Sequence, residues 1–411
     1  TVQPSELLQK GTVRRKMRRR TAEKTKETKE TKETRRVFAM QYRKFGSLDG
    51  VEVSALGFGC MRLPVVSRDG KDVIDEKRAV GMIRHAIDEG VNYIDTAYPY
   101  HNGESEYLVG KALKDGYREK VYLATKCPVW LLKKPEDFDR YLEEQLEKLG
   151  VETIDFYLLH ALSRDRFEQI VKKFDLVSCM ERAKAAGKIR HIGFSFHDDL
   201  ETFKEIVDFY PWDFCQIQYN YVDTEHQAGT AGLEYAAQKG LGVVIMEPLR
   251  GGKLAVPAPH LAEVFPAEKK PVEWALDFLW NRPEVSLVLS GMSTEEQVED
   301  NLAYASRSQV GMLKEEDQEI FRKAREIFNT MALVKCTRCE YCMPCPSGIN
   351  IPEIFSIYNK VATDGKNAAK ELYDAQETKA DACVRCRKCE KVCPQHIGVS
   401  SVMLEIQEEF Q

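Results

Sequence analysis

The sequence contains no long hydrophobic run. No stretch approaches the ~18 consecutive apolar residues that a transmembrane helix requires, and the first residues lack the apolar core of a signal peptide. The 411 residues carry a formal net charge of only −5, so the composition as a whole favours neither a polyanion nor a membrane surface as a partner. These absences predict a cytoplasmic protein that binds neither nucleic acid nor membrane.

A complete dinucleotide-binding loop is also missing. The motif GxGxxG would follow the first strand of a doubly wound sheet, but residues 57–62 read GFGCMR and do not complete it. No residue pattern indicates a flavin. The doubly wound open sheet is therefore the less favoured of the two α/β folds that strand and helix alternation allows.

Strand-like segments alternate with helix-like segments from residue 53 onward. Residues 76–90 and 136–150 have apolar residues at three- and four-residue spacing and end on a glycine, as amphipathic helices do. Strand followed by helix eight times over about 250 residues predicts a (β/α)8 TIM barrel. The eight apolar runs cover residues 53–59, 91–97, 121–127, 154–160, 189–196, 213–220, 242–248 and 285–291.

Eight of the twelve cysteines lie in two short runs near the C-terminus. Thiolates at such spacing surround an inorganic cluster, and each run closes on Cys-Pro, as bacterial iron–sulfur motifs do. Structural zinc is the less favoured alternative. Disulfides are a further alternative that a long intracellular chain disfavours. The runs are Cys336, Cys339, Cys342, Cys345 and Cys383, Cys386, Cys389, Cys393.

The remaining cysteines lie in or beside apolar runs, where a thiol packs as a small hydrophobe. We expect this of Cys60, Cys127, Cys179 and Cys215. Cys60 and Cys127 also end strands near the predicted site, which leaves a redox role as the alternative for these two.

Four polar residues stand at or just beyond the ends of three successive predicted strands. Asp95 ends one strand, Tyr100 follows it by five residues, Lys126 ends the next, and His160 ends the one after. Each of these residues taken alone could have a purely structural role, such as capping a helix or being a hydrogen-bonded histidine in the core. Catalytic groups of a TIM barrel come from these strand ends, so together the four predict an active site.

This pattern resembles the aldo-keto reductase superfamily over about residues 42–304. The resemblance includes the opening hairpin YRKFGSLDGVEVS, GFGCMRL, DTAxxY, the ATK strand, the DFYLLH strand and IGFS. It implies reduction of a small carbonyl substrate by hydride transfer from NADH or NADPH. Tyr100 would be the general acid, Lys126 would lower the Tyr100 pKa, Asp95 would pair with Lys126, and His160 would orient the carbonyl oxygen.

Cofactor contacts implied by the resemblance are less complete. Ser195 and Gln216 fall where the family holds the nicotinamide carboxamide, and Asn301 falls where it holds adenine. Arg250, together with Lys253, would offset a glutamate near the pyrophosphate path. The departures from the family are Phe196, Met246 and Glu247, and the uncharged Gly291 and Gln297 beside the acidic Glu295 and Glu296. NADH is therefore at least as well supported as NADPH.

The cysteine runs resemble two-cluster bacterial ferredoxins over about 65 residues. That resemblance implies two 4Fe–4S clusters and an exchange of the fourth ligand between the runs. One cluster would use Cys336, Cys339, Cys342 and Cys393, and the other Cys383, Cys386, Cys389 and Cys345. The first run departs from the usual final spacing, which makes the exchange of Cys345 the weaker inference. A redox partner protein is a possible consequence of such a domain.

We expect four parts: a basic tail at 1–39, the barrel at 40–312, a connecting helix at 313–334 and a ferredoxin-like iron–sulfur domain at 335–411. The tail carries 13 Lys/Arg against 5 Glu and leaves −13 for the remaining chain. Its repetitive residues 21–36 predict disorder or a solvated helix. We interpret the tail as foreign to the native chain; a nucleic-acid, membrane-surface or targeting role is the alternative.

The ferredoxin-like part should cover or flank the mouth of the barrel, with one cluster nearer to Tyr100 than the other. Residues between the two cysteine runs are expected to reach over the barrel loops. Three functions are open: a carbonyl oxidoreductase, an electron-transfer subunit with weak or no nicotinamide binding, and a non-enzymatic regulatory barrel. The tetrad and the cysteines make the third the weakest.

Overall fold

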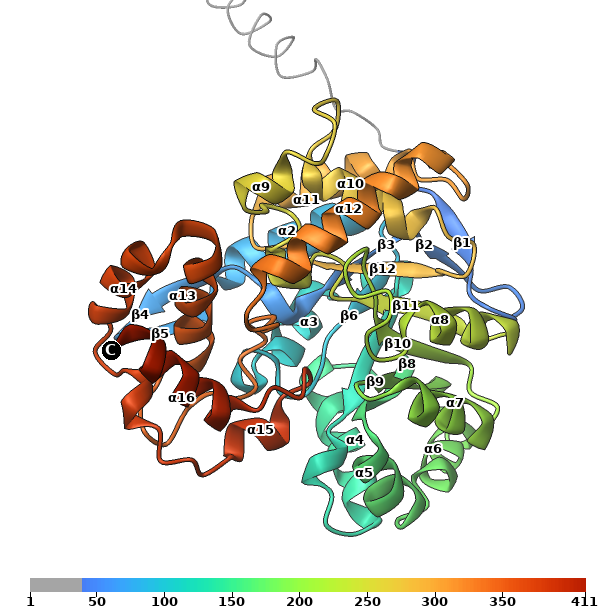
Figure 1. The fold of residues 1–411 in the computed structure, drawn as a ribbon. Helices are drawn as coiled ribbons and strands as arrows, with labels where there is room; N and C mark the ends of the chain where they lie inside the picture. The colour runs from blue at the N-terminus through green and yellow to red at the C-terminus, as the bar shows by residue number, and fades with distance from the viewer. Residues whose placement is uncertain (1–38) are drawn as a thin grey trace, which may run out of the picture. The chain divides into compact units, whose positions relative to one another are not determined.

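Eight parallel strands close into a barrel in the order β10-β11-β12-β3-β6-β7-β8-β9 (Figure 1). The structure is a computed structural model that describes residues 39–411, and residues 1–38 of the predicted basic tail lie outside this range. Each barrel strand falls on one of the eight predicted apolar runs, so the predicted fold is confirmed. The strands are β3 (Leu56–Gly59), β6 (Tyr93–Asp95), β7 (Tyr122–Cys127), β8 (Ile154–Leu162), β9 (Ile189–Phe196), β10 (Phe214–Gln218), β11 (Gly242–Met246) and β12 (Leu287–Gly291).

Helices connect successive strands around the outside of the barrel. Side-chain caps fix several of their first turns: Asp75 accepts from the Arg78 amide, and Asp199 accepts from the Thr202 amide. Gly150 ends a helix in the left-handed conformation, as its closing position predicted. The helices are α2 (Glu76–Asp88), α3 (Ser105–Ala112), α4 (Glu136–Leu149), α5 (Arg164–Arg166), α6 (Leu176–Ala185), α7 (Leu200–Phe209), α8 (Gly229–Gln238), α9 (Pro259–Ala262), α10 (Pro271–Trp280) and α11 (Glu295–Ser306).

A hairpin closes the N-terminal end of the barrel. Strands β1 (Tyr42–Lys44) and β2 (Glu52–Ser54) pair antiparallel, and the fully buried Phe45 follows β1. The Phe45 ring packs against Phe156 and Phe214, with ring centroids 4.8 and 5.8 Å apart. A Cβ on Gly242 would stand 2.6 Å from the Phe45 ring, so glycine is required there. Because the hairpin closes this end, a ligand can enter the barrel only from the opposite end, where the strands have their C-terminal residues.

A second hairpin was not predicted. Strands β4 (Val65–Arg68) and β5 (Lys71–Ile74) pair antiparallel between β3 and α2. Most of its side chains are exposed, so it carries little of the apolar alternation that reveals a strand in a sequence.

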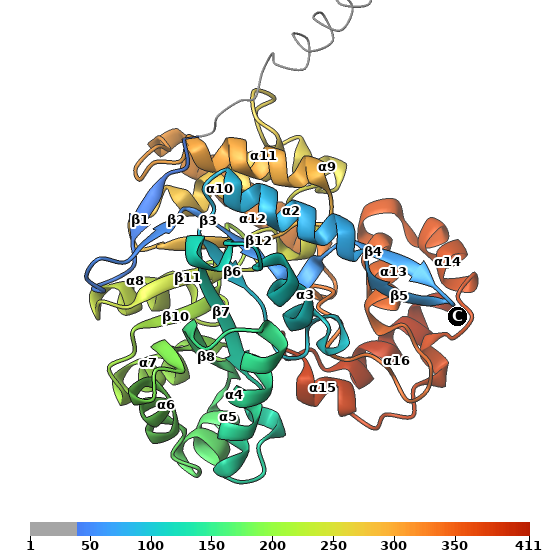
Figure 2. The ribbon, with the colours of Figure 1, turned by 180° about the vertical axis from the view of Figure 1, so that it is seen from behind.

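The C-terminal residues beyond the barrel are helical. Helix α12 (Glu315–Met331) falls inside the range predicted for a connecting helix, and its Phe321 ring packs 5.0 Å from Phe278 of the barrel. Four further helices share one apolar core, which includes Ile354, Phe355 and Met403. They gather at the red end of the chain in Figures 1 and 2. These helices are α13 (Ile351–Asp364), α14 (Lys366–Asp374), α15 (Lys388–Val392) and α16 (Val399–Phe410).

Residues 40–411 form one compact unit, so the iron–sulfur segment and the barrel can be described together. Gln395, just after the second cysteine run, exchanges side-chain hydrogen bonds with Gln218 at the end of β10, the shorter at 2.7 Å. Gln227 donates to the Pro394 carbonyl at 3.0 Å. No helix among residues 39–411 is both long enough and apolar enough to cross a membrane.

Candidate functional site

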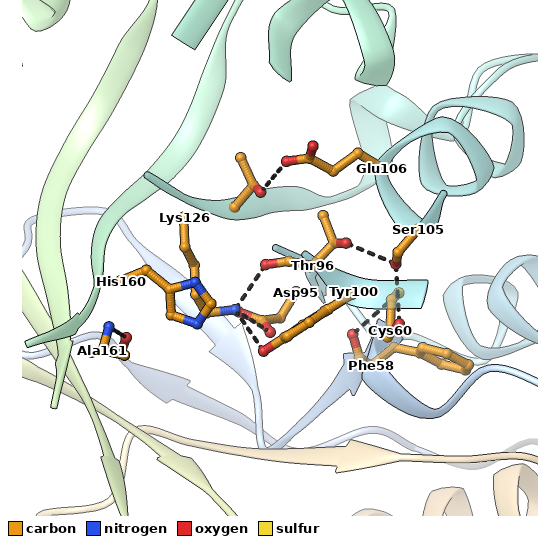
Figure 3. Close-up of polar contacts among 12 residues, drawn as sticks. Phe58, Cys60, Asp95, Thr96, Tyr100, Ser105, Glu106, Lys126, His160 and Ala161 are labelled. Carbon is orange, nitrogen blue, oxygen red and sulfur yellow. Dashed lines mark hydrogen bonds and ion pairs between the residues drawn. The ribbon is translucent and has the colours of Figure 1, made fainter. Parts of the chain in front are cut away.

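The four predicted catalytic side chains meet at the open end of the barrel. Asp95 ends β6, and Tyr100 begins the short 3-10 helix that follows β6. Lys126 is the second-last residue of β7, and His160 lies in β8. Figure 3 shows Tyr100, Asp95 and Lys126 directed toward one another, with the His160 ring beside them. Parallel barrel strands bring their C-terminal ends to one face, which is why residues far apart in sequence converge here.

Lys126 is the centre of the hydrogen bonds at the site. Its ammonium donates to both Asp95 carboxylate oxygens at 2.7 and 2.8 Å and to the Thr96 carbonyl at 2.7 Å (Figure 3). Both charged side chains are almost fully buried. Burial favours the neutral form of each, raising the Asp95 pKa and lowering the Lys126 pKa, and the direct ion pair opposes this. Three hydrogen bonds hold the ammonium in one place.

The Tyr100 phenol holds its proton firmly. Burial raises the Tyr100 pKa well above 10, and nearby Tyr341 and the Asp95 carboxylate raise it further. That Lys126 lowers this pKa stays a prediction. The ammonium is engaged by Asp95, and it stands 3.5 Å from the phenol oxygen. The phenol is therefore a protonated hydrogen-bond donor at neutral pH.

His160 is a neutral imidazole. Burial lowers its pKa well below 6.5, and the cations of Lys126 and Arg166 lower it further. Its ring packs 5.1 Å from Trp130 and edge-on to Tyr100 at 6.2 Å. The Nδ1 atom has no hydrogen-bond partner. The imidazole can therefore offer a hydrogen bond to a ligand without carrying a positive charge into the site.

An elongated cavity of about 790 Å³ opens from these side chains toward β12 and the start of α11. Its walls include three of the four predicted nicotinamide-cofactor contacts, Ser195, Gln216 and Asn301. The Gln216 side-chain oxygen is buried without a partner, so it is free to accept from a carboxamide. The cavity volume and this orphaned acceptor fit a nicotinamide.

Arg250, the fourth predicted contact, does not line this cavity. The Arg250 backbone has a positive φ of 51°. Its fully buried guanidinium is directed to Asp223, and Nε donates a hydrogen bond to the Asp223 carboxylate at 2.9 Å. Its other two nitrogens have no partner, and the guanidinium lies over the Phe328 ring of α12 at 5.2 Å. Arg250 thus belongs to the contact between the barrel and α12 rather than to the cavity wall.

Arg62, rather than Arg250, lines the cavity beside Glu247. Both cations lower the pKa of that glutamate against the effect of burial, Arg62 more strongly, so Arg250 offsets Glu247 as expected. Sequence reasoning quoted the GFGCMRL stretch without giving Arg62 a role. The signal was its place three residues beyond the end of β3, which is a strand end like the others.

The far end of the cavity carries mixed charge. Gly291 and Gln297 line it without charge, and Glu296 faces it. Lys270 also lines it, paired with Asp300 at 2.8 Å. Glu295 instead pairs with Arg78 at 2.7 Å on the outer surface. The cations near this end are the paired Lys270 and Arg62, whose side chain lies against Gly291.

Tyr341, from the first cysteine run, forms part of the active-site wall. Its hydroxyl lies 3.5 Å from His160 Nε2, and it interacts with the Tyr100 hydroxyl. Thr337 and Cys339 of the same run, and Pro394 and Gln395 after the second run, line the same cavity. The segment therefore flanks the mouth, as expected, but through the cysteine runs rather than through the residues between them.

The eight cysteines of the two runs gather in two sets. Burial raises the Cys342 pKa to about 12, and the thiols of Cys339, Cys336 and Cys393 add to the effect, which places these four together. The second set surrounds a cavity of about 210 Å³ lined by Cys345, Cys383, Cys386 and Cys389 as well as Cys342. Among residues 39–411 no three such side chains are arranged for a single metal ion.

These two sets fit iron–sulfur clusters. A four-iron cage is wider than one ion, so its four thiolates stand around a space instead of meeting at a point. The two sets also combine the runs as the ferredoxin resemblance implies. Cys60, Cys127, Cys179 and Cys215 are all buried in the barrel, as predicted.

Comparison with known proteins divides the chain in the same place. Residues 55–318 match the model of the aldo/keto reductase family, and residues 332–397 match that of a 4Fe-4S dicluster domain. Among curated proteins, the chain is similar to L-galactose dehydrogenase of Arabidopsis thaliana, with 30% identity over 300 residues, covering 66% of this chain and 90% of that protein. It also matches the probable aldo-keto reductase 1 of Glycine max at 30% identity, covering 49% of this chain and 58% of that protein.

The barrel is also similar to solved structures. An aldo-keto reductase from Bacillus halodurans, in its holo form, superposes with a TM-score of 0.59 and 26% sequence identity. The alignment covers 69% of this chain and 96% of that structure.

Proposed function

Because this chain belongs to the aldo/keto reductase family and carries a 4Fe-4S dicluster domain, we propose that it reduces an aldehyde or ketone with NADH or NADPH, using Tyr100 as the general acid. One observation carries the proposal: a buried phenol, an ion-paired ammonium and a neutral imidazole converge on one wall of a nicotinamide-sized cavity. The small carbonyl substrate would lie against that wall.

The protein's own groups act on the carbonyl oxygen. Tyr100 donates a hydrogen bond and then its proton to that oxygen, and the uncharged His160 holds the oxygen in position. The Lys126 ammonium, fixed by Asp95, stabilises the negative charge left on the phenol. A nicotinamide, when bound, supplies the hydride to the carbonyl carbon. Gln216 and Ser195 would hold its carboxamide, and Asn301 its adenine.

The cysteines would hold two clusters. Cys336, Cys339, Cys342 and Cys393 would bind one, and Cys345, Cys383, Cys386 and Cys389 the other. Such clusters, when bound, store and pass single electrons. The first set is the nearer to Tyr100, since Tyr341 lies between two of its members.

The test is turnover by anaerobically purified protein with NADH or NADPH and a panel of aldehydes and ketones. Oxidation of sugars with NAD⁺ or NADP⁺ is measured as well, because one relative is named as a sugar dehydrogenase. We expect Tyr100→Phe to lower turnover by a factor of about 10² to 10⁴, the range of general acid catalysis, and to leave nucleotide binding nearly unchanged. Tyr107→Phe, on the exposed face of α3, is the matched control.

The second candidate function is an electron-transfer subunit with weak or no nicotinamide binding. Two observations favour it: Tyr341 contacts both Tyr100 and His160, and the acidic Glu247 and Glu296 line the cavity where a dinucleotide would lie. Calorimetric titration with NADH and NADPH separates the two functions. No heat with either nucleotide, in protein that retains its iron, would establish the second candidate over the first.

A further inference from the structure

Tyr341 comes from the iron–sulfur segment and lies against the candidate catalytic residues of the barrel. It stands between Cys339 and Cys342 in sequence, yet its hydroxyl contacts the two barrel residues that would bind a carbonyl oxygen. The Tyr341 hydroxyl interacts with the Tyr100 hydroxyl and lies 3.5 Å from His160 Nε2, and all three side chains line one cavity. An oxygen that lies beside both a phenol hydroxyl and an imidazole is placed as a substrate carbonyl oxygen would be.

We propose that the Tyr341 hydroxyl occupies the position of the substrate's carbonyl oxygen, so that a carbonyl compound binds only by displacing it. The proposal rests on the assignment of Tyr100 and His160 to carbonyl binding. It makes Tyr341 a residue that determines substrate affinity, contributed to the barrel by the iron–sulfur segment.

The backbone around Tyr341 is held against the barrel. The Arg62 guanidinium donates to the Thr337 and Arg338 carbonyls at 3.2 and 3.4 Å. A Cβ on Gly251 would stand 2.3 Å from the Thr337 oxygen, so only a glycine permits this approach. With its loop fixed at this point, the Tyr341 side chain is the group that yields to an incoming substrate.

The experiment compares wild-type holoprotein with Tyr341→Phe, which removes one hydroxyl and leaves the ring. Tyr358→Phe is the matched control, because Tyr358 lies in α13 and its ring packs edge-on to Phe410, within the apolar core of the iron–sulfur segment. Benzoate serves as the probe, since a carboxylate oxygen can accept from Tyr100 and His160 without reaction. Its binding is measured by calorimetry in parallel with aldehyde KM and kcat.

Tyr341→Phe should bind benzoate more tightly and lower the aldehyde KM by roughly 2- to 10-fold, the range of one net hydrogen bond that no longer has to be displaced. Iron content and kcat should stay within twofold of wild type. Weaker benzoate binding, or no change, would overturn the proposal. Because benzoate binds without turnover, an inactive enzyme with the expected binding change refutes carbonyl reduction and leaves the Tyr341 inference intact.

A different observation concerns the second cysteine run. Cys386 is exposed, and four cations stand exposed around it: Arg385, Arg387, Lys388 and Lys391. We call these four residues the basic rim. Only Arg387 has an acidic partner, Glu390, at the long distance of 3.8 Å. Val384, beside them, is 70% exposed.

The basic rim contrasts with the rest of the molecule. The chain beyond residue 39 has a formal charge of −13, so a positive patch around a thiol of the second set is a local exception. Complementary charge accelerates encounter between proteins and selects the partner. We infer that the basic rim docks an acidic one-electron carrier protein, which gives up one electron as the cluster held by Cys383, Cys386, Cys389 and Cys345 gains one.

The test uses an acidic flavodoxin as the probe carrier and the variant Arg385→Glu/Lys388→Glu. The matched control is Lys173→Glu/Lys204→Glu, which makes the same charge change on exposed positions of the barrel. Binding of oxidised flavodoxin is measured by calorimetry at low and high salt. Reduction of the clusters by reduced flavodoxin is followed by stopped-flow absorbance, with dithionite as the small reductant.

We expect the rim variant to lose at least 10-fold in flavodoxin affinity and in reduction rate at low salt, with little loss for the control and with dithionite reduction unchanged. Equal losses in the rim and control variants would show a non-specific charge effect and refute the docking site. Salt-independent binding would refute it as well.

Discussion

At the scale of single residues, the pairing of Lys126 with Asp95 has the sharpest energetic consequence. Both are buried, so removing one partner leaves the other's charge without compensation. We predict that Lys126→Met abolishes most carbonyl reduction and lowers the free energy of unfolding by about 3–5 kcal/mol, because the Asp95 carboxylate is left unpaired. Thermal and denaturant unfolding measure the loss.

The double variant Lys126→Met/Asp95→Asn serves as the control. It removes both charges, so it should regain most of the stability but none of the activity. A double variant as unstable as the single one would show that the ion pair is not what Lys126 contributes to stability.

The four candidate catalytic residues could be brought together from the sequence, because three lie at or near strand ends, Tyr100 follows one of them, and the strand periodicity is strong. The sequence does not reveal that Arg250 turns away from the cavity, because the left-handed backbone at that residue and the contact of its guanidinium with Asp223 leave no pattern in residues 247–253. Tyr341 was missed because its neighbours, the cysteines, explain the run without it. Its role depends on a contact between residues 181 positions apart.

At the scale of elements, the two cysteine runs are combined in space. Cys393 of the second run stands with Cys336, Cys339 and Cys342 of the first. We predict about eight irons and eight sulfides per wild-type chain, and about four of each in Cys393→Ser, because one complete set is lost. The loss should also change benzoate binding, since Tyr341 lies between two members of that set.

Cys386→Ser is the matched variant in the other set. It should lose the same amount of iron but change benzoate binding less, because Tyr341 is the only residue that its cavity shares with the active-site cavity. Equal effects of the two variants on benzoate would contradict the division into two sets. Iron analysis and calorimetry on anaerobic protein measure both quantities.

At the scale of the whole molecule, buried histidines set the response to acid. Burial lowers the pKa of His160 well below 6.5 and that of His197 to about 3, so both are neutral when folded and become charged when unfolded below pH 6.5. Their contribution to stability is therefore complete above about pH 6.5 and falls as the pH falls. Between pH 7.5 and 5.5 each should cost about 1.4 kcal/mol of unfolding free energy.

Urea unfolding at the two pH values measures this change. His197→Asn should reduce the loss by about half of the two-histidine effect. A pH dependence that His197→Asn does not alter would contradict the assignment.

Figures 1 and 2 show helices α13 and α14 at the red end of the chain, and the turn between them is exposed around Gly365. This turn would lie inside a closed loop, because a cluster held by the first cysteine set would join residues 336–342 to residue 393. On the chain-entropy account, a cross-link that closes a loop of about 50 residues stabilises the fold by about 4 kcal/mol. The iron–sulfur cluster would thus act as a cross-link that a chelator can remove. A protein nicked by a protease at Gly365 should stay in one piece in mild denaturant and separate into two fragments only when a chelator takes the iron away.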